Sequence, residues 1–295
     1  MNVFMTGASG WIGSAAVPEL LAMGHRVRGI ARSERSAAAL IEAGVEPVPG
    51  DLDQLDVLRA EAERADAVIH LANKHDWSNP AESNRAERAA VETFVTALEG
   101  SGKPFLLASG TAILVDKTLT ELDANPTSGP DAPRGGTEAL AMEYADRGVH
   151  SVALRFAPTV HGAGDHGFMA RLVETARERG VSGYVGDGSN HWTAVHRFDA
   201  GRLVALALAQ ASGGSAVHAV AELLTTRAIA EAIGEALGVP VVSVDPDRVA
   251  EHFGWLGAIF ALDLPASAEL TRERFGWAPT HPTLAEDLAA GAYTR

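Results

Sequence analysis

The chain has 295 residues, of which 46% are hydrophobic and 21% are charged, and this composition is typical of a soluble globular protein. Its formal net charge of −14 argues against nucleic acid as a partner, because phosphate binding usually needs a basic surface. The absence of cysteine excludes disulfides, thiolate metal sites and cysteine nucleophiles.

A glycine-rich turn follows the first predicted strand, which lies at residues 3–5. The turn occupies residues 6–13, and a helical pattern of apolar side chains comes after it. Gly7 permits the tight turn, Gly10 lets backbone N–H groups approach a pyrophosphate, and Gly13 lets helix and strand pack closely. The sequence therefore predicts a dinucleotide site, with a glycine-rich turn that binds nothing as the alternative.

Strands and helices alternate over the next 140 residues or so. The predicted strands are residues 26–31, 45–48, 67–72, 104–109 and 151–156. The predicted helices between them are residues 37–43, 55–62, 82–98 and 138–146. This alternation predicts an α/β fold, a doubly wound parallel sheet of the Rossmann type covered on both faces. Ligands of such sheets lie at the carboxyl ends of the strands.

The pattern changes beyond residue 160. Helices are predicted at residues 168–179, 200–210 and 226–233, and strands at residues 216–220 and 239–244. Gly180 should end the first of these helices, and Thr225 or Thr226 should cap the last. Residues 181–197 are rich in glycine and aromatic side chains, and the proline-containing tail is expected to be rich in loops.

Several segments resemble landmarks of the extended and atypical short-chain dehydrogenase/reductase superfamily, in particular the NAD(P)-dependent epimerases/dehydratases. They are the glycine turn, residues 50–52, 70–72, 154–162, 195–199 and 275–279. The resemblance covers essentially the whole chain and implies an NAD(P)-binding Rossmann core at residues 1–160. It also implies a small C-terminal α/β substrate lobe at residues 161–295, from which residues 195–220 return to the sheet.

The resemblance also implies which residues meet the cofactor. Asp51 is expected to bind the adenine amino group, Leu52 to pack on the ring, and Ala72 and Asn73 to line the ribose and pyrophosphate. Ala157 is expected near the nicotinamide. The full expected set is Gly7, Ser9, Gly10, Trp11, Ile12, Gly13, Arg32, Asp51, Leu52, Leu71, Ala72, Asn73 and Ala157.

Arg32 bears on the choice between NAD and NADP. Relatives that prefer NAD usually carry an acidic residue at the end of the second strand, where this chain has Arg32 and, close by, Arg35. An arginine binds a 2′-phosphate and cannot accept a hydrogen bond from a ribose hydroxyl. We therefore expect NADP rather than NAD. The alternative is that these arginines, with Arg26 and Arg28, form a solvated basic edge.

The catalytic pair of the superfamily, Tyr-x-x-x-Lys, is absent from this chain. None of the three tyrosines has a lysine four residues later. Arg134 stands in the place of the tyrosine and Glu138 in the place of the lysine. Arginine stays charged and cannot move a proton at neutral pH. The two residues could form an i,i+4 ion pair or a solvated helix start; otherwise Arg134 could bind an anionic substrate group and Glu138 the ribose hydroxyls.

Other candidate catalytic side chains follow neighbouring strands. Ser109 ends the fifth strand, where the superfamily keeps a hydroxyl donor, and Thr111 is the alternative. His166 and His75 are candidate acid–base groups, because histidine titrates near pH 7. The matching tyrosine of the superfamily is usually structural at the position of His161, so we expect that side chain to pack. No metal site is expected.

Four aromatic residues of the second half belong either to a substrate pocket or to the core: Phe168, Tyr184, Trp192 and Trp255.

Two functions remain open from the sequence. One is an NADP-dependent oxidoreductase, or a related epimerase/dehydratase-type enzyme, acting on a small molecule. The other is a non-catalytic NADP-binding or redox-sensing protein, suggested by the missing pair. No apolar run is long enough to span a membrane. We expect a cytoplasmic protein, since the first strand leaves no room for a signal peptide, and a monomer or weak homodimer, because the helix at residues 82–98 is highly charged.

Overall fold

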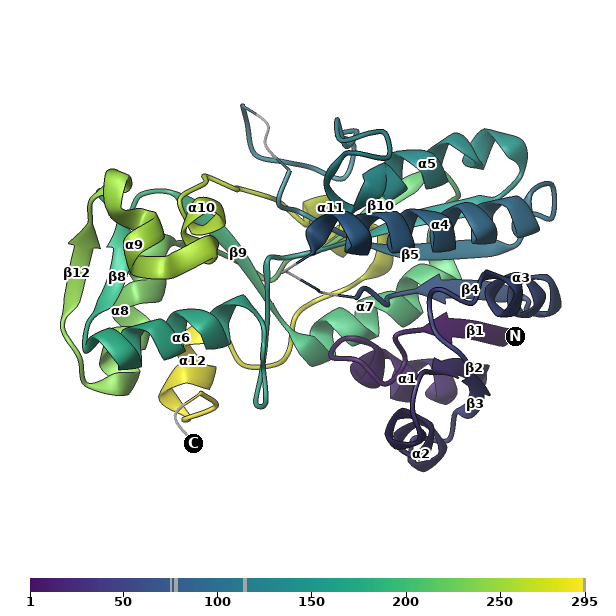
Figure 1. The fold of residues 1–295 in the computed structure, drawn as a ribbon, viewed down its shortest axis with the longest axis horizontal. Coiled ribbons are helices and arrows are strands. Elements are labelled where there is room, and N and C mark those ends of the chain that lie inside the picture. Colours follow the sequence, from purple (N-terminus) through teal and green to yellow (C-terminus); the bar gives the residue numbers. More distant parts are fainter. Residues whose placement is uncertain (75, 77–78, 114–115, 294–295) are drawn as a thin grey trace. The chain divides into compact units, whose positions relative to one another are not determined.

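The computed structural model describes residues 1–74, 76, 79–113 and 116–293, and these form two compact units. Unit 1 comprises residues 1–109, 121–155 and 200–217, and unit 2 comprises residues 110–120, 156–199 and 218–295. Both are shown in Figure 1. No helix among the described residues is long and apolar enough to cross a lipid bilayer.

A seven-stranded sheet forms the centre of unit 1, in the order β10-β6-β5-β4-β1-β2-β3. Its strands are β1 (Asn2–Thr6), β2 (Arg26–Ala31), β3 (Glu46–Pro49), β4 (Ala67–His70), β5 (Pro104–Gly110), β6 (His150–Phe156) and β10 (Ser215–Ala219). The neighbours from β3 through β2, β1 and β4 to β5 pair in parallel. This order confirms the α/β fold with a doubly wound sheet, and it reverses between β1 and β4, where such sheets bind ligands.

The helices of unit 1 pack on this sheet. They are α1 (Gly13–Ala22), α2 (Glu34–Glu42), α3 (Leu55–Arg64), α4 (Pro80–Leu98), α5 (Thr137–Glu143) and most of α7 (Arg197–Gln210). Phe94 of α4 packs against Phe4 of β1 and Phe105 of β5, with ring centroids 6.2 and 5.7 Å apart. At Gly201 of α7 a Cβ would lie 2.5 Å from the backbone carbon of Ala15, so α1 and α7 are in close contact.

Unit 2 contains two small sheets and several short helices. Its strands are β7 (Thr159–His161), β8 (Ser182–Val185), β9 (His191–His196), β11 (Glu222–Thr225) and β12 (Val241–Val244). Its helices are α6 (Phe168–Arg179), α8 (Thr226–Leu237), α9 (Val249–Phe253), α10 (Gly257–Phe260), α11 (Glu269–Phe275) and α12 (Leu284–Ala289). In one sheet β9 pairs in parallel with β7 and antiparallel with β11, and in the other β8 pairs in parallel with β12.

Local signals placed some boundaries of unit 2 correctly and missed others. Thr225 caps α8 by accepting a hydrogen bond from the Ala228 N–H, and Gly180 ends α6 with φ +68°, as predicted. The glycine- and aromatic-rich segment, however, forms β8 and β9, and the tail contains the short helices α9 to α12. Trp192 is fully buried and donates to the Thr159 hydroxyl at 2.8 Å, so it belongs to the core.

Candidate active site

The glycine turn between β1 and α1 is closed by contacts that leave no room for side chains. Gly7 has φ +72°, which favours glycine, and a Cβ there would lie 2.7 Å from the Ala72 backbone nitrogen. A Cβ at Gly13 would lie 2.0 Å from the Gly7 carbonyl oxygen, while the Gly10 N–H donates to that same oxygen at 2.9 Å. No side chain caps α1, and the N–H groups of Ser14, Ala15 and Ala16 donate to the backbone carbonyls of Gly10 and Ile12. The start of α1 therefore offers an anionic ligand the positive end of the helix dipole.

The edge that follows β2 carries the arginines of the cofactor prediction. Arg32 and Arg35 are exposed, and neither has an ion-pair partner within the described ranges. Arg28 differs, because its guanidinium pairs with Glu61 at 2.8 Å and Glu46 at 2.5 Å. The four arginines therefore do not form one uniform solvated edge. Nearby, Asp51 is exposed and Leu52 is buried, at the end of β3.

Thr6 and His70 link the carboxyl ends of β1 and β4. The Thr6 hydroxyl lies 2.7 Å from His70 Nδ1 and accepts a hydrogen bond from the Ala72 N–H at 3.2 Å. Burial lowers the pKa of His70 from 6.5 to about 3, and the nearby Arg134 charge contributes to that shift. His70 is therefore a neutral structural side chain. It holds Thr6, whose hydroxyl and carbonyl oxygens accept from the backbone N–H groups of Ala72 and Leu71, two predicted cofactor residues.

Arg134 meets a buried carboxylate of α4. Glu87 is 1% exposed, and its Oε1 accepts from Arg134 Nε at 3.0 Å and from Arg134 Nη2. The other oxygen of Glu87 accepts from the Asn73 side-chain amide. Asn73, which follows β4, and Arg134 therefore bind the same carboxylate. Both were predicted from the sequence as residues of the site.

The backbone at Arg134 is strained. It has φ +55° and is the one non-glycine residue with positive φ among those described, followed by Gly135 and Gly136 with φ +63° and +61°. A left-handed conformation costs a side-chain-bearing residue about 1–2 kcal/mol. The Arg134 N–H donates to the Asn84 side chain at 3.0 Å, and Arg88 donates to the Gly135 carbonyl at 2.7 Å. Helix α4 therefore holds the strained turn in place.

Glu138, in the first turn of α5, lies in a second buried network. Its Oε1 accepts from Arg155 Nε at 3.0 Å and from Arg155 Nη2 at 2.6 Å. Its Oε2 accepts from the Ser109 hydroxyl at 2.5 Å and from the Asn125 amide at 3.3 Å. Glu138 and Arg155 are 5% and 2% exposed, so they form a buried ion pair that joins α5 to β6 and to the end of β5.

These contacts correct two alternatives drawn from the sequence. Arg134 and Glu138 do not pair with each other, because the turn at Pro133–Gly136 takes Arg134 off the helix and each residue has another ionic partner. Glu138 is also no solvated helix start, since it is buried. Neither partner, Glu87 or Arg155, was among the residues expected from the sequence. The sequence feature that could have identified them is a charged residue on an otherwise apolar face, because such a residue requires a counter-ion when it is buried.

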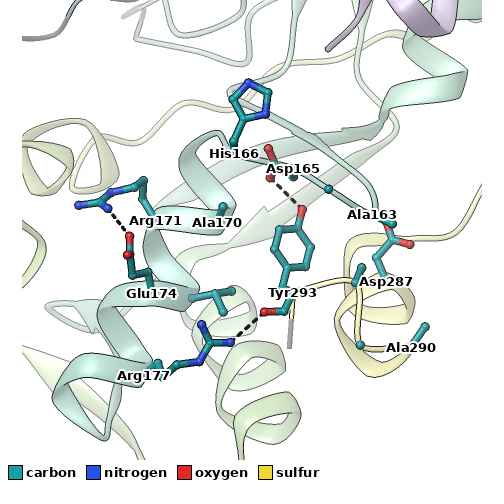
Figure 2. A pocket seen from close by; sticks show the side chains of 14 residues that line it. Ala163, Asp165, His166, Ala170, Arg171, Glu174, Arg177, Asp287, Ala290 and Tyr293 are labelled. Carbon is teal, nitrogen blue, oxygen red and sulfur yellow. Dashed lines mark hydrogen bonds and ion pairs between the residues drawn. The ribbon is translucent and has the colours of Figure 1, made fainter. Parts of the chain in front are cut away.

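A cavity of about 760 Å³ in unit 2 holds another candidate, His166 (Figure 2). His166 is exposed on the wall of this cavity, next to Asp165, which accepts a hydrogen bond from the Tyr293 hydroxyl at 2.9 Å. Burial and the Asp165 charge raise the pKa of Tyr293, so this phenol is a poor acid. His161 is fully buried with Nδ1 2.6 Å from Asp287, in agreement with packing.

The remaining candidates lie in several places. Thr111, in unit 2, is buried and 3.2 Å from the Thr193 hydroxyl. Ala157, also in unit 2, is buried and its N–H donates to the Ala219 carbonyl at 3.2 Å. Ser9 is exposed and Trp11 and Ile12 are half-buried in the glycine turn. His75 lies outside the described residues. Within the described ranges no three histidine or carboxylate side chains converge as metal ligands.

Comparison with solved structures supports the fold. A dTDP-glucose 4,6-dehydratase from Streptomyces venezuelae, solved with NAD and TYD bound, matches with a TM-score of 0.77. The match covers 99% of this chain and 96% of that chain at 21% sequence identity. At this identity the likeness shows the fold alone.

Comparison of sequences gives the family. A model described as the NAD dependent epimerase/dehydratase family matches residues 3–220 and confirms the resemblance inferred from the sequence. An uncharacterised protein of Schizosaccharomyces pombe is 42% identical over 294 residues, which are 99% of this chain and 100% of that protein. A 2-alkyl-3-oxoalkanoate reductase of Stenotrophomonas maltophilia is 30% identical over 202 residues, 64% of this chain and 60% of that protein.

His70 should make the unfolding free energy fall as the pH drops. The unfolded chain takes up a proton near pH 6.5 and the folded chain only near pH 3, so stability is lost between those values as the pH falls. The loss is about 1.4 kcal/mol per pH unit, or about 2 kcal/mol at pH 5. Urea titrations at pH 7 and pH 5 measure this drop in unfolding free energy. The drop should be about 2 kcal/mol smaller in His70→Gln than in the parent, and the control His166→Gln should behave like the parent. Equal losses in parent and His70→Gln would contradict this role.

Restoring the lysine of the superfamily pattern should damage this protein. In Glu138→Lys the new ammonium would face the buried Arg155 guanidinium, so we expect the unfolding free energy to fall by about 3–5 kcal/mol. Adding Arg155→Glu should recover about half of that loss, since the pair is reversed. The control Glu143→Lys makes the same change at an exposed position of α5 and should alter stability by less than about 0.5 kcal/mol. If Glu138→Lys were as stable as Glu143→Lys, the buried ion pair would not stabilise the fold as we infer.

Proposed function

The chain belongs to the NAD-dependent epimerase/dehydratase family, and on that basis we propose that it is an NADP-dependent oxidoreductase acting on a small carbonyl or hydroxyl compound. The observation that carries the proposal is the closed glycine turn, where the Gly13 position admits no Cβ. The start of α1, at the β1/β4 switch point, carries the positive end of the helix dipole and suits a pyrophosphate. NADP, when bound, supplies or accepts a hydride.

The preference for NADP over NAD rests on Arg32. Its guanidinium is exposed directly after β2 and has no ion-pair partner in the described segments of the chain, whereas Arg28 is neutralised by Glu46 and Glu61. A guanidinium that is not already paired can form two parallel hydrogen bonds to a 2′-phosphate. The position directly after β2 holds this arginine and not the carboxylate that would accept from a ribose 2′-hydroxyl.

The chain's own chemistry follows from the replaced catalytic pair. Arg134 keeps its proton and can only bind or stabilise negative charge. Ser109 donates its proton to the Glu138 carboxylate, so its oxygen is available as an acceptor. When the substrate is an alcohol, its hydroxyl proton passes to Ser109 Oγ while the Ser109 proton passes to Glu138. Reduction of a carbonyl uses the same path in reverse. The reductase name of the Stenotrophomonas maltophilia relative supports this class of reaction.

A second function, a non-catalytic NADP-binding or redox-sensing protein, is favoured by one observation. Both positions of the family's catalytic pair hold charged residues engaged in ion pairs with buried partners, Arg134 with Glu87 and Glu138 with Arg155. Such pairs can have a purely structural role. This alternative keeps the cofactor site and predicts no turnover.

Cofactor binding can be measured through Trp11, which lies inside the glycine turn. We expect NADPH to quench tryptophan fluorescence at lower concentration than NADH, and Arg32→Gln to weaken NADPH binding at least tenfold without changing NADH binding, because one charge-assisted phosphate contact is lost. Trp11→Phe should remove most of the quenching and leave calorimetric NADPH binding intact. Equal affinities in parent and Arg32→Gln would contradict the assignment of Arg32, and no binding of either nucleotide would contradict the proposed function.

Turnover separates the enzyme from the sensor. NADPH oxidation should be followed with a panel of small ketones, aldehydes and oxo acids. For any substrate found, Ser109→Ala should lower kcat about 100-fold, because a positioned proton-transfer group contributes at least that much. The same measurement on His166→Ala tests the other acid–base candidate, and a larger fall in kcat there than in Ser109→Ala would assign the proton transfer to His166. Tight NADPH binding without turnover of any member would favour the sensor instead.

A further inference from the structure

The guanidinium of Arg134 has unused hydrogen-bond donors. Of its five N–H groups, the Nε–H and one Nη2–H point to Glu87 Oε1, which leaves three. None of these three has an acceptor within the described ranges. Arg134 is also not fully enclosed, since 37% of its side chain remains exposed. One edge of the planar guanidinium is therefore anchored, and the other edge is open to a ligand.

The orientation of that open edge is set by its surroundings. Glu87 is 1% exposed and is held from its other oxygen by Asn73, so the carboxylate cannot turn away. The turn is equally constrained, because a Cβ at Gly135 would lie 2.7 Å from the Asn84 carbonyl oxygen. A strained, non-glycine residue between such restraints is a known mark of functional sites. A glycine at position 134 would avoid the strain and would lose the guanidinium.

We propose that Arg134 anchors the carboxylate of a short hydroxycarboxylate substrate, an inference that rests on the proposed function. The two donors on the open edge match the two oxygens of a carboxylate. Arg134 is four residues before Glu138, so the two Cα atoms are at most about 14 Å apart. Ser109 contacts Glu138 and receives the reacting hydroxyl group. In a substrate that reaches both, the carboxylate and the hydroxyl group must therefore lie within a short span of each other.

The polarity of Ser109 is consistent with the same substrate. Its proton is donated to Glu138, so the ligand group that meets Ser109 must itself be a donor. A hydroxycarboxylate has a hydroxyl donor for Ser109 and an anion for Arg134. Both protein groups belong to unit 1. Glu87 and Glu138 are positioning residues here, since each acts through the side chain that it holds.

The test uses the full-length protein saturated with NADP⁺. Calorimetry measures the binding of 2- and 3-hydroxycarboxylates of three to six carbons and of the neutral amides of the same acids. We expect the acids to bind at least tenfold more tightly than their amides. Arg134→Gln should abolish that preference while the affinity for NADPH stays within threefold of the parent. Arg134→Lys should keep some of it, because the charge remains without the planar edge.

Two further variants guard against misfolding and non-specific charge effects. Arg134→Gln leaves a buried carboxylate unpaired, so the combination with Glu87→Gln restores a neutral, better-folded site and should still lack the preference. Arg85→Gln removes an exposed arginine of α4, paired with Glu82, and should keep the preference of the parent.

Each remaining outcome overturns the inference. Equal binding of acids and amides, or no binding of any acid at millimolar concentration while NADPH still binds, would show that Arg134 holds no substrate carboxylate. A tenfold loss of NADPH affinity in Arg134→Gln would make Arg134 a ligand of the cofactor. Failure of the parent to bind NADPH would instead reject the proposed function, and calorimetry distinguishes that result from the others.

Discussion

The buried ion pair between Glu138 and Arg155 is the constraint on which the centre of unit 1 depends. An ionised carboxylate without partners is too costly to bury, and Glu138 is surrounded by four donors from Arg155, Ser109 and Asn125. These donors come from β5, from β6 and from the segment before α5. The pair therefore fixes the start of α5, and it also determines in which direction the Ser109 hydroxyl points its proton.

Glu87 has the same role on helix α4. It lies on the buried face of that helix beside Ala90, Val91 and Phe94, where only a paired carboxylate is tolerated. Its partner Arg134 belongs to a turn that three consecutive left-handed residues make possible. A strain of about 1–2 kcal/mol at Arg134 is small compared with the cost of leaving a buried carboxylate unpaired. The conformation of the turn and the position of the guanidinium are thus consequences of one buried charge.

Which features could be predicted from the sequence depends on how many positions separate the residues that contact each other. The glycine turn was predictable because Gly10 and Gly13 contact Gly7, three and six positions away, and the sheet was predictable because apolar strands alternate with helices. The ionic partners were not, since Glu87 and Arg134 are 47 residues apart and no periodicity links them. The sequence did contain one usable signal. Arg155 lies inside an apolar strand, so a buried counter-ion for it could have been predicted. In unit 2 the predicted strand at residues 239–244 is found as β12, whereas β8 and β9 were not predicted because they lie in a glycine-rich segment.

The sequence predicts that Arg134 and Glu138 stand in the places of the family's tyrosine and lysine, and this exchange would change what the site can contribute to a reaction. A tyrosine beside a lysine can give and take a proton, whereas a guanidinium holds its proton and offers only fixed positive charge and directed donors. In the proposed reaction proton transfer runs through Ser109, whose hydroxyl donates a hydrogen bond to a carboxylate. The polarity of the proposed site is then the reverse of the family pattern. Where that pattern presents a donor to a carbonyl oxygen, the site as proposed presents an acceptor to a hydroxyl group, and Arg134 binds the part of the ligand that carries negative charge.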